Sequence, residues 1–443
     1  MTEQGKPLFD GLLQYCTRCC MPETQEGVSF DELGVCTACR ASEQKMHINW
    51  AAREVRLREI LEQYKSVSGN NYDCLLPISG GKDSTFQMHV LTKIYGLKPL
   101  AVTFSHNWYS KTGLYNLYNS LEKFEVDHIM FTPNRGLVNK LARRSLAMIG
   151  DSCWHCHMGV GAFPLQIAVR FGIKLLVWGE SLSEADGRAT YFDGVTRYDR
   201  DYFTKVSARH EADAMINDYL TAKDVYPFQL PTHEEIDRAG IVGIHLGDFI
   251  FWDDERQTEF VKRAYAWRED YVEGTYKCYK SVECIMAGVH DYSKFIKRGF
   301  GRGTDHASQD VRAGLLTREE GFDLAKQADL DRPKALDYYL DITGFDEQTF
   351  VDTLVAKRDE TASKLPVVVA PPKAGEKPLR PAIVEMVYGT PAPDEGPREP
   401  ISQYPYDPAQ MPTEIGREVV SSAIDSSGTV MEKLPADLAG NKR

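Results

Sequence analysis

Short apolar runs alternate with amphipathic stretches through the middle of the chain. Four of these runs have the length and composition of buried β-strands, at residues 74–78, 100–104, 129–131 and 173–178. Apolar residues at helical spacing separate the runs, for example over residues 84–96 and 160–171. Strands that alternate with helices are typical of β-α-β units, so the pattern predicts an α/β fold with a Rossmann-like parallel sheet.

The regions on either side of this alternation look helical. Residues 49–64 carry apolar side chains at helical spacing, and residues 317–362 read as helices throughout. Thr317 and Glu320 have the spacing of a capping box, and a last helix should restart near Asp346. We therefore expect a cysteine-rich knuckle with a connecting helix, an α/β domain, a helical module and a tail, at residues 1–60, 61–316, 317–364 and 365–443.

The expected tail is rich in proline. It holds 13 of the 22 prolines, and proline lacks the N–H that helix and sheet interiors require. The tail is therefore predicted to be extended. Two interpretations stay open: a flexible terminus, or an arm that packs on a neighbouring subunit of a homo-oligomer through scattered apolar residues such as Ile383 and Tyr388.

Charge and hydropathy restrict the binding partners and the cellular compartment that we expect for this protein. The chain has 52 Lys and Arg against 64 Asp and Glu, a net charge of −12, which argues against nucleic acid as a partner. No window approaches the ~20 apolar residues of a membrane span, and the first 15 residues do not resemble a signal peptide. We therefore expect a cytoplasmic protein without membrane contact, whose ten cysteines are reduced.

Four of these cysteines have the spacing of a zinc site. Cys16 and Cys19 form one Cys-x-x-Cys pair, and Cys36 and Cys39 form a second. Four thiolates arranged in this way suit one tetrahedral Zn²⁺, which would stabilise a small segment that has little core of its own. Cys20 is a spare thiol that could take the place of Cys19.

The segment that follows the first predicted strand suits an anion. Residues 79–84 read Ser-Gly-Gly-Lys-Asp-Ser, and a helix is expected to begin near Asp83. Adjacent glycines allow close backbone approach, and the helix N-terminus directs N–H groups at a phosphate. Ser79 and Ser84 add hydroxyl donors, Lys82 adds a cation, and Asp83 can cap the helix or hold Mg²⁺. The alternative is a chance Gly80-Gly81 turn, and the spacing is not that of a Walker A loop.

The 79–84 string resembles the PP-loop of the N-type ATP pyrophosphatases. The resemblance implies an adenine nucleotide alpha hydrolase-like fold and ATP whose β,γ-pyrophosphate lies in the loop. An acceptor oxygen then attacks the α-phosphorus, which gives an adenylate and pyrophosphate. It also places adenosine near Thr103, Phe104 and Ser105. Gly179 and Glu180 follow another strand, where open α/β sheets bind ligands.

A second cysteine pair, Cys153 and Cys156, lies between the third and fourth predicted strands, ahead of the helix expected at 160–171. The pair could be a metal site, a redox pair, a reactive thiol or simply buried packing. It is placed like the Cys-x-x-Cys of PP-loop tRNA thiolation enzymes, which implies an iron–sulfur cluster with a third cysteine, Cys284 or Cys278. Cys74 is expected in the core.

Polar residues downstream offer further candidates. Lys294 and Arg302 belong to a basic, glycine-rich run that could contact pyrophosphate or a sugar phosphate, or could form solvated helix ends. Residues 304–306, Thr-Asp-His, could orient a substrate or cap a helix. Three carboxylates could bind Mg²⁺ or sugar hydroxyls, or solvate a loop: Asp248, Asp253 and Asp254.

Together these segments resemble the N-acetyl sugar amidotransferases of bacterial surface-polysaccharide and nonulosonic-acid pathways, over roughly residues 10–360. The shared segments include residues 79–84, the first two Cys-x-x-Cys pairs, residues 104–108, 246–253 and 290–308. The resemblance implies that ATP adenylates the N-acetyl oxygen of a sugar, and that ammonia then displaces AMP to leave an acetamidino group. It also implies separate glutaminase and cyclase-like proteins that supply ammonia.

Two rival functions share the loop. One is a PP-loop sulfurtransferase that thiolates RNA or a small molecule with a cysteine-bound iron–sulfur cluster. The other is a catalytically silent ATP-binding scaffold. The acidic net charge argues against RNA as the substrate, and the presence of Lys82, Asp83 and Ser84 argues against a silent protein.

Overall fold

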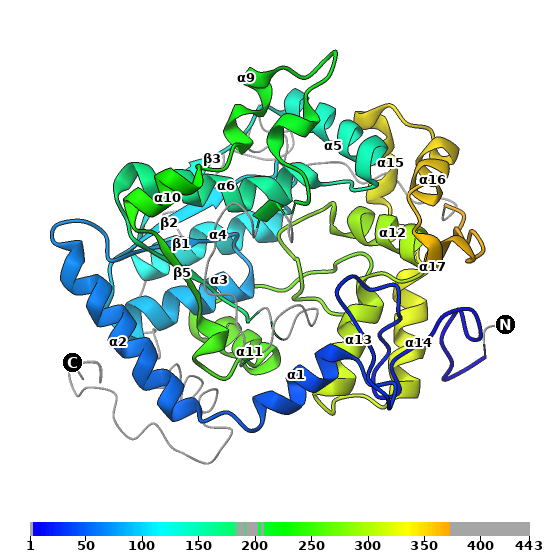
Figure 1. The fold of residues 1–443 in the computed structure, drawn as a ribbon, viewed down its shortest axis with the longest axis horizontal. Coiled ribbons are helices and arrows are strands. Elements are labelled where there is room, and N and C mark those ends of the chain that lie inside the picture. Colours follow the sequence, from blue (N-terminus) through cyan, green and yellow to red (C-terminus); the bar gives the residue numbers. More distant parts are fainter. Residues whose placement is uncertain (1–2, 182, 184–190, 192–202, 205–207, 373–443) are drawn as a thin grey trace.

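The computed structural model describes residues 3–181, 183, 191, 203–204 and 208–372. Its centre is a parallel sheet of five strands in the order β3-β2-β1-β4-β5 (Figure 1). This arrangement confirms the predicted α/β architecture. The strands are β1 (Cys74–Pro77), β2 (Pro99–Phe104), β3 (Asp127–Phe131), β4 (Leu175–Trp178) and β5 (Val242–His245).

Strand β1 occupies the middle of the sheet. Leu75 pairs with Leu100 of β2 on one side and with Leu176 of β4 on the other. Because side chains alternate along a strand, Leu75 packs into the hydrophobic cluster on one face of the sheet and Leu76 into the cluster on the opposite face. Both faces are therefore apolar, and the whole of β1 is buried except for partly exposed Pro77.

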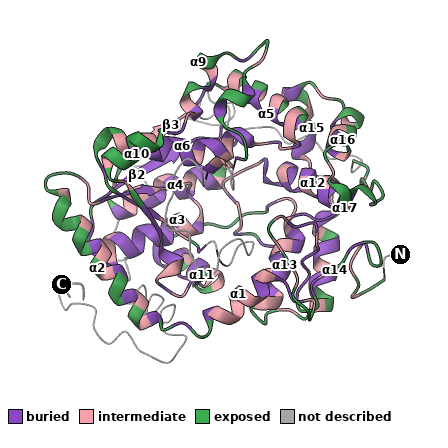
Figure 2. Ribbon diagram, viewed as in Figure 1, coloured by how far each residue is buried: buried purple, intermediate pink, exposed green. Residues whose placement is uncertain are grey.

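Helices cover both faces of the sheet (Figure 1). One face packs against α6 (Trp154–Phe171), with α5 (Arg135–Ile149) and α10 (His233–Ala239) next to it. The other face carries α3 (Lys82–Met88), α4 (Lys111–Phe124) and α11 (Asp254–Tyr265), while α2 (Trp50–Ser68) runs along the outside. Figure 2 shows the exposed residues of α2 and α10 on the outer side of the molecule.

Two helices differ from the sequence prediction. The helix expected at 84–96 begins at Lys82, and after Met88 it continues as a π-helix, η1 (His89–Ile94). The helix expected at 160–171 begins earlier, at Trp154, so the Cys153–Cys156 pair spans its N-cap and first turn.

The C-terminal part is helical. It comprises α12 (Ala287–Arg298), α13 (Arg302–Arg312), α14 (Arg318–Asp329), α15 (Ala335–Thr343), α16 (Glu347–Val355) and α17 (Glu360–Ser363). The predicted capping box is present: Thr317 Oγ1 accepts from the Glu320 N–H, and the Glu320 carboxylate accepts from the Thr317 N–H. Asp346 caps α16 in the expected position.

The N-terminal segment, including α1 (Thr37–Lys45), lies against these C-terminal helices (Figure 1). The Arg318 guanidinium donates to the Cys16 carbonyl at 2.7 and 3.1 Å and to the Cys19 carbonyl at 3.0 Å. The Gly5 N–H donates to Asp323 Oδ1 at 2.9 Å. The two ends of the described chain thus form one packed unit.

Short 3-10 and α-helical turns complete the described chain between β4 and α11: η3 (Ala212–Met215), α9 (Ala222–Val225), η4 (Tyr226–Phe228) and η5 (Leu246–Asp248). The greater part of the expected tail, from residue 373 on, lies outside the described residues.

Among the helices of the described residues, none is both long enough and apolar enough to cross a bilayer.

Candidate functional site

The 79–84 loop connects the end of β1 to the start of α3, as the sequence predicts. Gly81 is the N-cap of α3, and Gly80 has a φ of +88°. A Cβ on Gly80 would lie only 2.7 Å from the Gly113 carbonyl oxygen of α4. Trp267 Nε1 donates to the Gly80 carbonyl at 3.0 Å. The loop is therefore held against α4 and against the segment that follows α11, and glycine is required at residue 80.

A cavity of about 440 Å³ lies over this loop. One wall is the loop with the start of α3. The opposite wall is formed by residues from the segment before α12 and from α12 and α13, including Lys280, Ser281 and Glu283. Of the residues that the sequence singled out, ten line the cavity: Ser79, Gly81, Lys82, Asp83, Ser84, Glu180, Lys294, Arg302, Asp305 and His306.

Lys82 is the buried cation of the cavity. Its side chain is 2% exposed, and Nζ lies 2.6 and 2.7 Å from the two carboxylate oxygens of Asp83 and 2.9 Å from Asp254 Oδ1. Burial alone would lower the pKa of Lys82, but the negative charges of Asp254, Asp83 and Glu180 outweigh burial and raise it. Lys82 is therefore a fixed positive charge on the floor of the cavity.

The carboxylates around Lys82 differ in their electrostatics. Burial acts to raise the pKa of Asp254, but the ion pairs with Lys280 and Lys82 hold it well below its usual range. Glu180 opens onto the cavity, and enclosure by protein atoms, followed by the charge of Asp83, raises the pKa of Glu180 to about 7. Neighbouring acids of unequal pKa can share proton transfer near neutral pH.

Only one of the three carboxylates predicted between β5 and α11 joins this group. Asp254 binds Lys82, whereas Asp253 Oδ1 accepts from the Arg256 N–H at 3.1 Å and so caps α11. Asp248 accepts from the Ser181 hydroxyl. Asp253 and Asp248 each have a hydrogen-bond partner within the fold, and their predicted contact with Mg²⁺ or sugar hydroxyls stays a prediction.

The wall opposite the loop is fixed by ion pairs. Arg302 Nε lies 2.9 Å from Asp291 Oδ2, and Lys294 Nζ lies 2.6 Å from Asp305 Oδ2. Lys297 of the same basic run donates instead to the Gly150 carbonyl at 3.0 Å. The run thus contributes two cations to the cavity, while Lys297 ties α12 to the end of α5.

Thr103, Phe104 and Ser105 lie at the carboxyl end of β2 and do not appear among the described residues that line the 440 Å³ cavity. Thr103 Oγ1 donates to the Ile78 carbonyl at 2.9 Å, and Phe104 packs against Gly159 of α6. Gly179 is likewise not among the described residues that line this cavity, and its carbonyl accepts from the Gly247 N–H at 2.9 Å. These residues border the strand that carries the loop, and their predicted contact with adenosine stays a prediction.

A larger cavity of about 820 Å³ adjoins the first. Glu180, Tyr279 and Gln309 line both cavities. Its remaining walls come from α1, from the start of α11 and from the end of α13, with Phe251 and Trp252 as apolar surface. Nothing in the sequence pattern indicated this second space, because its walls lie hundreds of residues apart along the chain.

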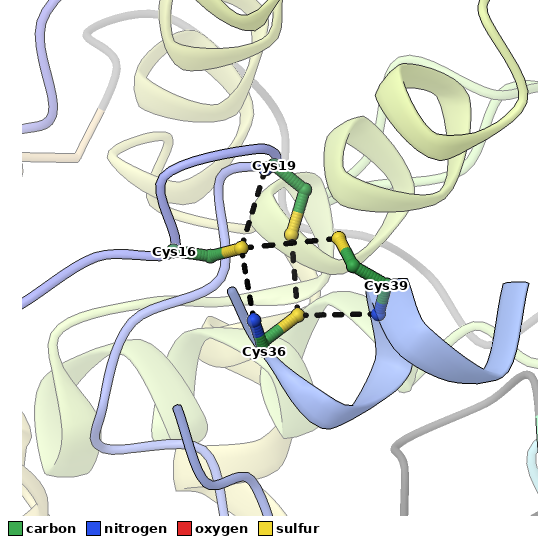
Figure 3. A group of neighbouring side chains, drawn as sticks. All are labelled: Cys16, Cys19, Cys36 and Cys39. Atoms are coloured by element: carbon green, nitrogen blue, oxygen red, sulfur yellow. Dashed lines mark hydrogen bonds between the residues drawn. The ribbon is translucent and has the colours of Figure 1, made fainter. Parts of the chain in front are cut away.

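The four predicted zinc cysteines converge on one point (Figure 3). Their sulfurs all lie within 4.8 Å of one another, with Cys16 and Cys39 at 3.8 Å and Cys19 and Cys36 at 3.6 Å. Zn–S bonds of about 2.3 Å in a tetrahedron place sulfurs roughly 3.8 Å apart, so the arrangement fits Zn²⁺. Cys20 instead packs on α14, where its thiol faces the Arg318 carbonyl at 3.6 Å.

The region of the second predicted cysteine site holds a group of possible metal ligands that the sequence did not indicate. Cys153 lies within 4.8 Å of possible ligand atoms of Asp151, His157 and His290. Cys156 and Cys284 do not belong to this group, but both lie near enough to Cys153 for their charges to add to burial and Asp151 in raising the pKa of its thiol. The predicted site at Cys153, Cys156 and Cys284 therefore stays a prediction. Cys74 is fully buried in β1, as predicted, and Cys278 is exposed.

The comparison with curated proteins gives one partial relative. An uncharacterized protein of Methanocaldococcus jannaschii, MJ1599, is 24% identical over 160 residues, which are 36% of this chain. The chain spans 56% of the length of that relative.

A protein-family model matches the segment that forms the wall opposite the loop. The cavity residues from Tyr279 to Gln309 all fall within residues 273–364. This segment matches the family model described as "LPS biosynthesis protein WbpG-like, C-terminal domain", and this part of the chain is therefore similar to the C-terminal domain of that family of lipopolysaccharide biosynthesis proteins.

Proposed function

We propose that this protein is an ATP-dependent amidotransferase of surface-polysaccharide biosynthesis. In this proposal it adenylates the N-acetyl group of a nucleotide sugar or nonulosonic acid, and ammonia then replaces the acetyl oxygen. The observation that most supports this proposal is the composition of the 440 Å³ cavity. A loop suited to phosphate forms one wall, and the segment similar to lipopolysaccharide biosynthesis proteins forms the other.

The residues around the loop suit the first half-reaction. An amide oxygen is a poor leaving group, and transfer of adenylate to it makes it a good one. The start of α3, the hydroxyls of Ser79 and Ser84 and the buried charge of Lys82 would bind the departing pyrophosphate. Asp83 offers the carboxylate oxygens that Mg²⁺ prefers, and Mg²⁺ bound there would offset the charge of the triphosphate.

Two adjoining cavities suit a reaction with two substrates. ATP would place its phosphates in the 440 Å³ cavity, and the sugar would enter from the 820 Å³ cavity, with Glu180 at the boundary. Glu180 could then take a proton from the attacking ammonia, because its pKa is raised to about 7. Ammonia would come from separate glutaminase and cyclase-like partners, with free ammonium as the substitute in vitro.

The experiment is mass spectrometry of candidate N-acetyl sugars incubated with the protein, ATP, Mg²⁺ and ammonium, together with a pyrophosphate assay. Amidination lowers the mass of the sugar by about one unit, whereas thiolation would raise it by about sixteen, as atomic masses require. Asp83→Ala should abolish pyrophosphate release, and Asp352→Ala on the exposed face of α16 should not. Undiminished pyrophosphate release by Asp83→Ala would refute the assignment of the loop.

A further inference from the structure

Two histidines, a cysteine and an aspartate meet outside the cavity. Asp151 and Cys153 precede α6, His157 lies in its first turn, and His290 lies on α12. Possible ligand atoms of all four lie within 4.8 Å of one another. Cys153 and His157 are four residues apart at the start of a helix, a spacing that places two side chains on the same face.

The distances within the group match those of a zinc site. Cys153 Sγ lies 3.8 Å from His157 Nε2. Tetrahedral Zn²⁺ with bonds of about 2.3 Å to sulfur and about 2.0 Å to nitrogen would hold these two atoms roughly 3.5 Å apart. A shift of a few tenths of an ångström would therefore bring both atoms into coordination.

Two carboxylates orient the histidine rings. Asp151 Oδ2 lies 3.2 Å from His157 Nδ1, while its Oδ1 accepts from the Cys153 N–H at 2.8 Å. Asp291, which is 3% exposed, lies 3.1 Å from His290 Nδ1. Histidines that bind metals usually donate their other ring nitrogen to a carboxylate in this way, which directs Nε2 toward the metal.

We propose that Cys153, His157 and His290 bind a second Zn²⁺. Because both oxygens of Asp151 already face His157 and the Cys153 N–H, Asp151 orients the ligands, as Asp291 does for His290. Three protein ligands leave the fourth position of a tetrahedral ion for water. His157 and His290 are 32% and 29% exposed, whereas the four cysteines of the first site are at most 4% exposed, so water can reach only this second ion.

The proposed ion would connect the sheet domain to the cavity wall. Cys153 is the N-cap and His157 lies in the first turn of α6, which packs on the sheet, and His290 belongs to the segment similar to WbpG-like proteins. The link continues from His290 to Asp291 and from Asp291 Oδ2 to Arg302 Nε at 2.9 Å, and Arg302 lines the 440 Å³ cavity. The zinc would thereby fix the position of Arg302.

The test is the zinc content of the full-length protein, which does not depend on the proposed activity. Wild type should hold two zinc ions per chain. Cys153→Ser and His157→Gln should each hold one, and the matched control Cys156→Ser should hold two. The zinc at Cys16, Cys19, Cys36 and Cys39 serves as the internal test of folding, because a variant that still holds one ion has kept its N-terminal site.

Two further measurements separate this site from its alternatives. Asp291→Asn should weaken the second zinc by about 10- to 100-fold in competition with a chelator, and should leave the first zinc unchanged. Iodoacetamide should label Cys153 more slowly in zinc-loaded protein than after mild chelation. A single zinc per chain in wild type, labelling of Cys153 that is indifferent to zinc, or acid-labile sulfide bound at Cys153 would each overturn the proposal.

Discussion

Replacing Gly80 by alanine tests how the 79–84 loop is held. At a φ of +88°, a residue with a Cβ is strained by about 1–2 kcal/mol. The added Cβ would also lie 2.7 Å from the Gly113 carbonyl oxygen and 2.9 Å from the Leu117 nitrogen, both backbone atoms of α4. Such overpacking costs about 1–3 kcal/mol, so Gly80→Ala should lower the free energy of unfolding by about 2–5 kcal/mol.

Gly240→Ala is the matched control, because Gly240 also has a positive φ, +65°, but has no atom within 4 Å of an added Cβ. Gly240→Ala should lower the free energy of unfolding only by the cost of the strained backbone, about 1–2 kcal/mol. Urea titration followed by circular dichroism measures both losses. Because the clash must move the loop, Gly80→Ala should also lower pyrophosphate release about 100-fold, whereas Gly240→Ala should not. Equal destabilisation by the two substitutions would refute the proposed contact between the loop and α4.

Two more predictions concern the titration of Asp329 and the removal of zinc from the four N-terminal cysteines. Burial raises the pKa of Asp329 to about 7, although Thr304 and the Gly301 N–H donate to it, so the folded protein keeps a proton that the unfolded chain releases near pH 3.8. Wild type should therefore lose stability relative to Asp329→Asn as the pH rises from about 4 to 7; parallel stability curves over this range would contradict the raised pKa. Chelation of zinc should expose residues 10–45 to proteases, because Cys16, Cys19, Cys36 and Cys39 form the centre of that segment. Identical digestion patterns with and without chelator would show that this segment does not need the metal.

The parts of the fold that could be predicted are those set by local pattern. Residues 74–78 are apolar throughout and residues 100–104 are apolar except for Thr103, and β1 and β2 lie there. β5 was missed because Val242–His245 is short, contains a glycine and ends in a polar residue, which is a weak strand pattern. The π-helical continuation at His89–Ile94 has no local pattern that distinguishes it from an α-helix.

The same holds for the site: residues that are close in sequence could be predicted, and residues that only folding brings together could not. Residues 79–84 and the four N-terminal cysteines are close in sequence, and their spacing indicated the loop and the metal group. Lys280 and Glu283, which line the same cavity as Lys82, lie in no recognisable motif. Likewise, only folding brings His290 to Cys153, since 137 residues separate them along the chain. The pattern around Cys153 favoured Cys156 because cysteine pairs are visible in sequence and distant histidines are not.

The contact of Arg318 with the cysteine knuckle has a consequence for synthesis on the ribosome. Arg318 lies 302 residues after Cys16, whose carbonyl it holds. At roughly 5–20 residues per second, Cys16 is made roughly 15–60 s before Arg318. During that interval the nascent N-terminal segment cannot form its contacts with α14. Zinc captured early would keep the waiting segment compact, and this would make metal supply a determinant of the yield of folded protein.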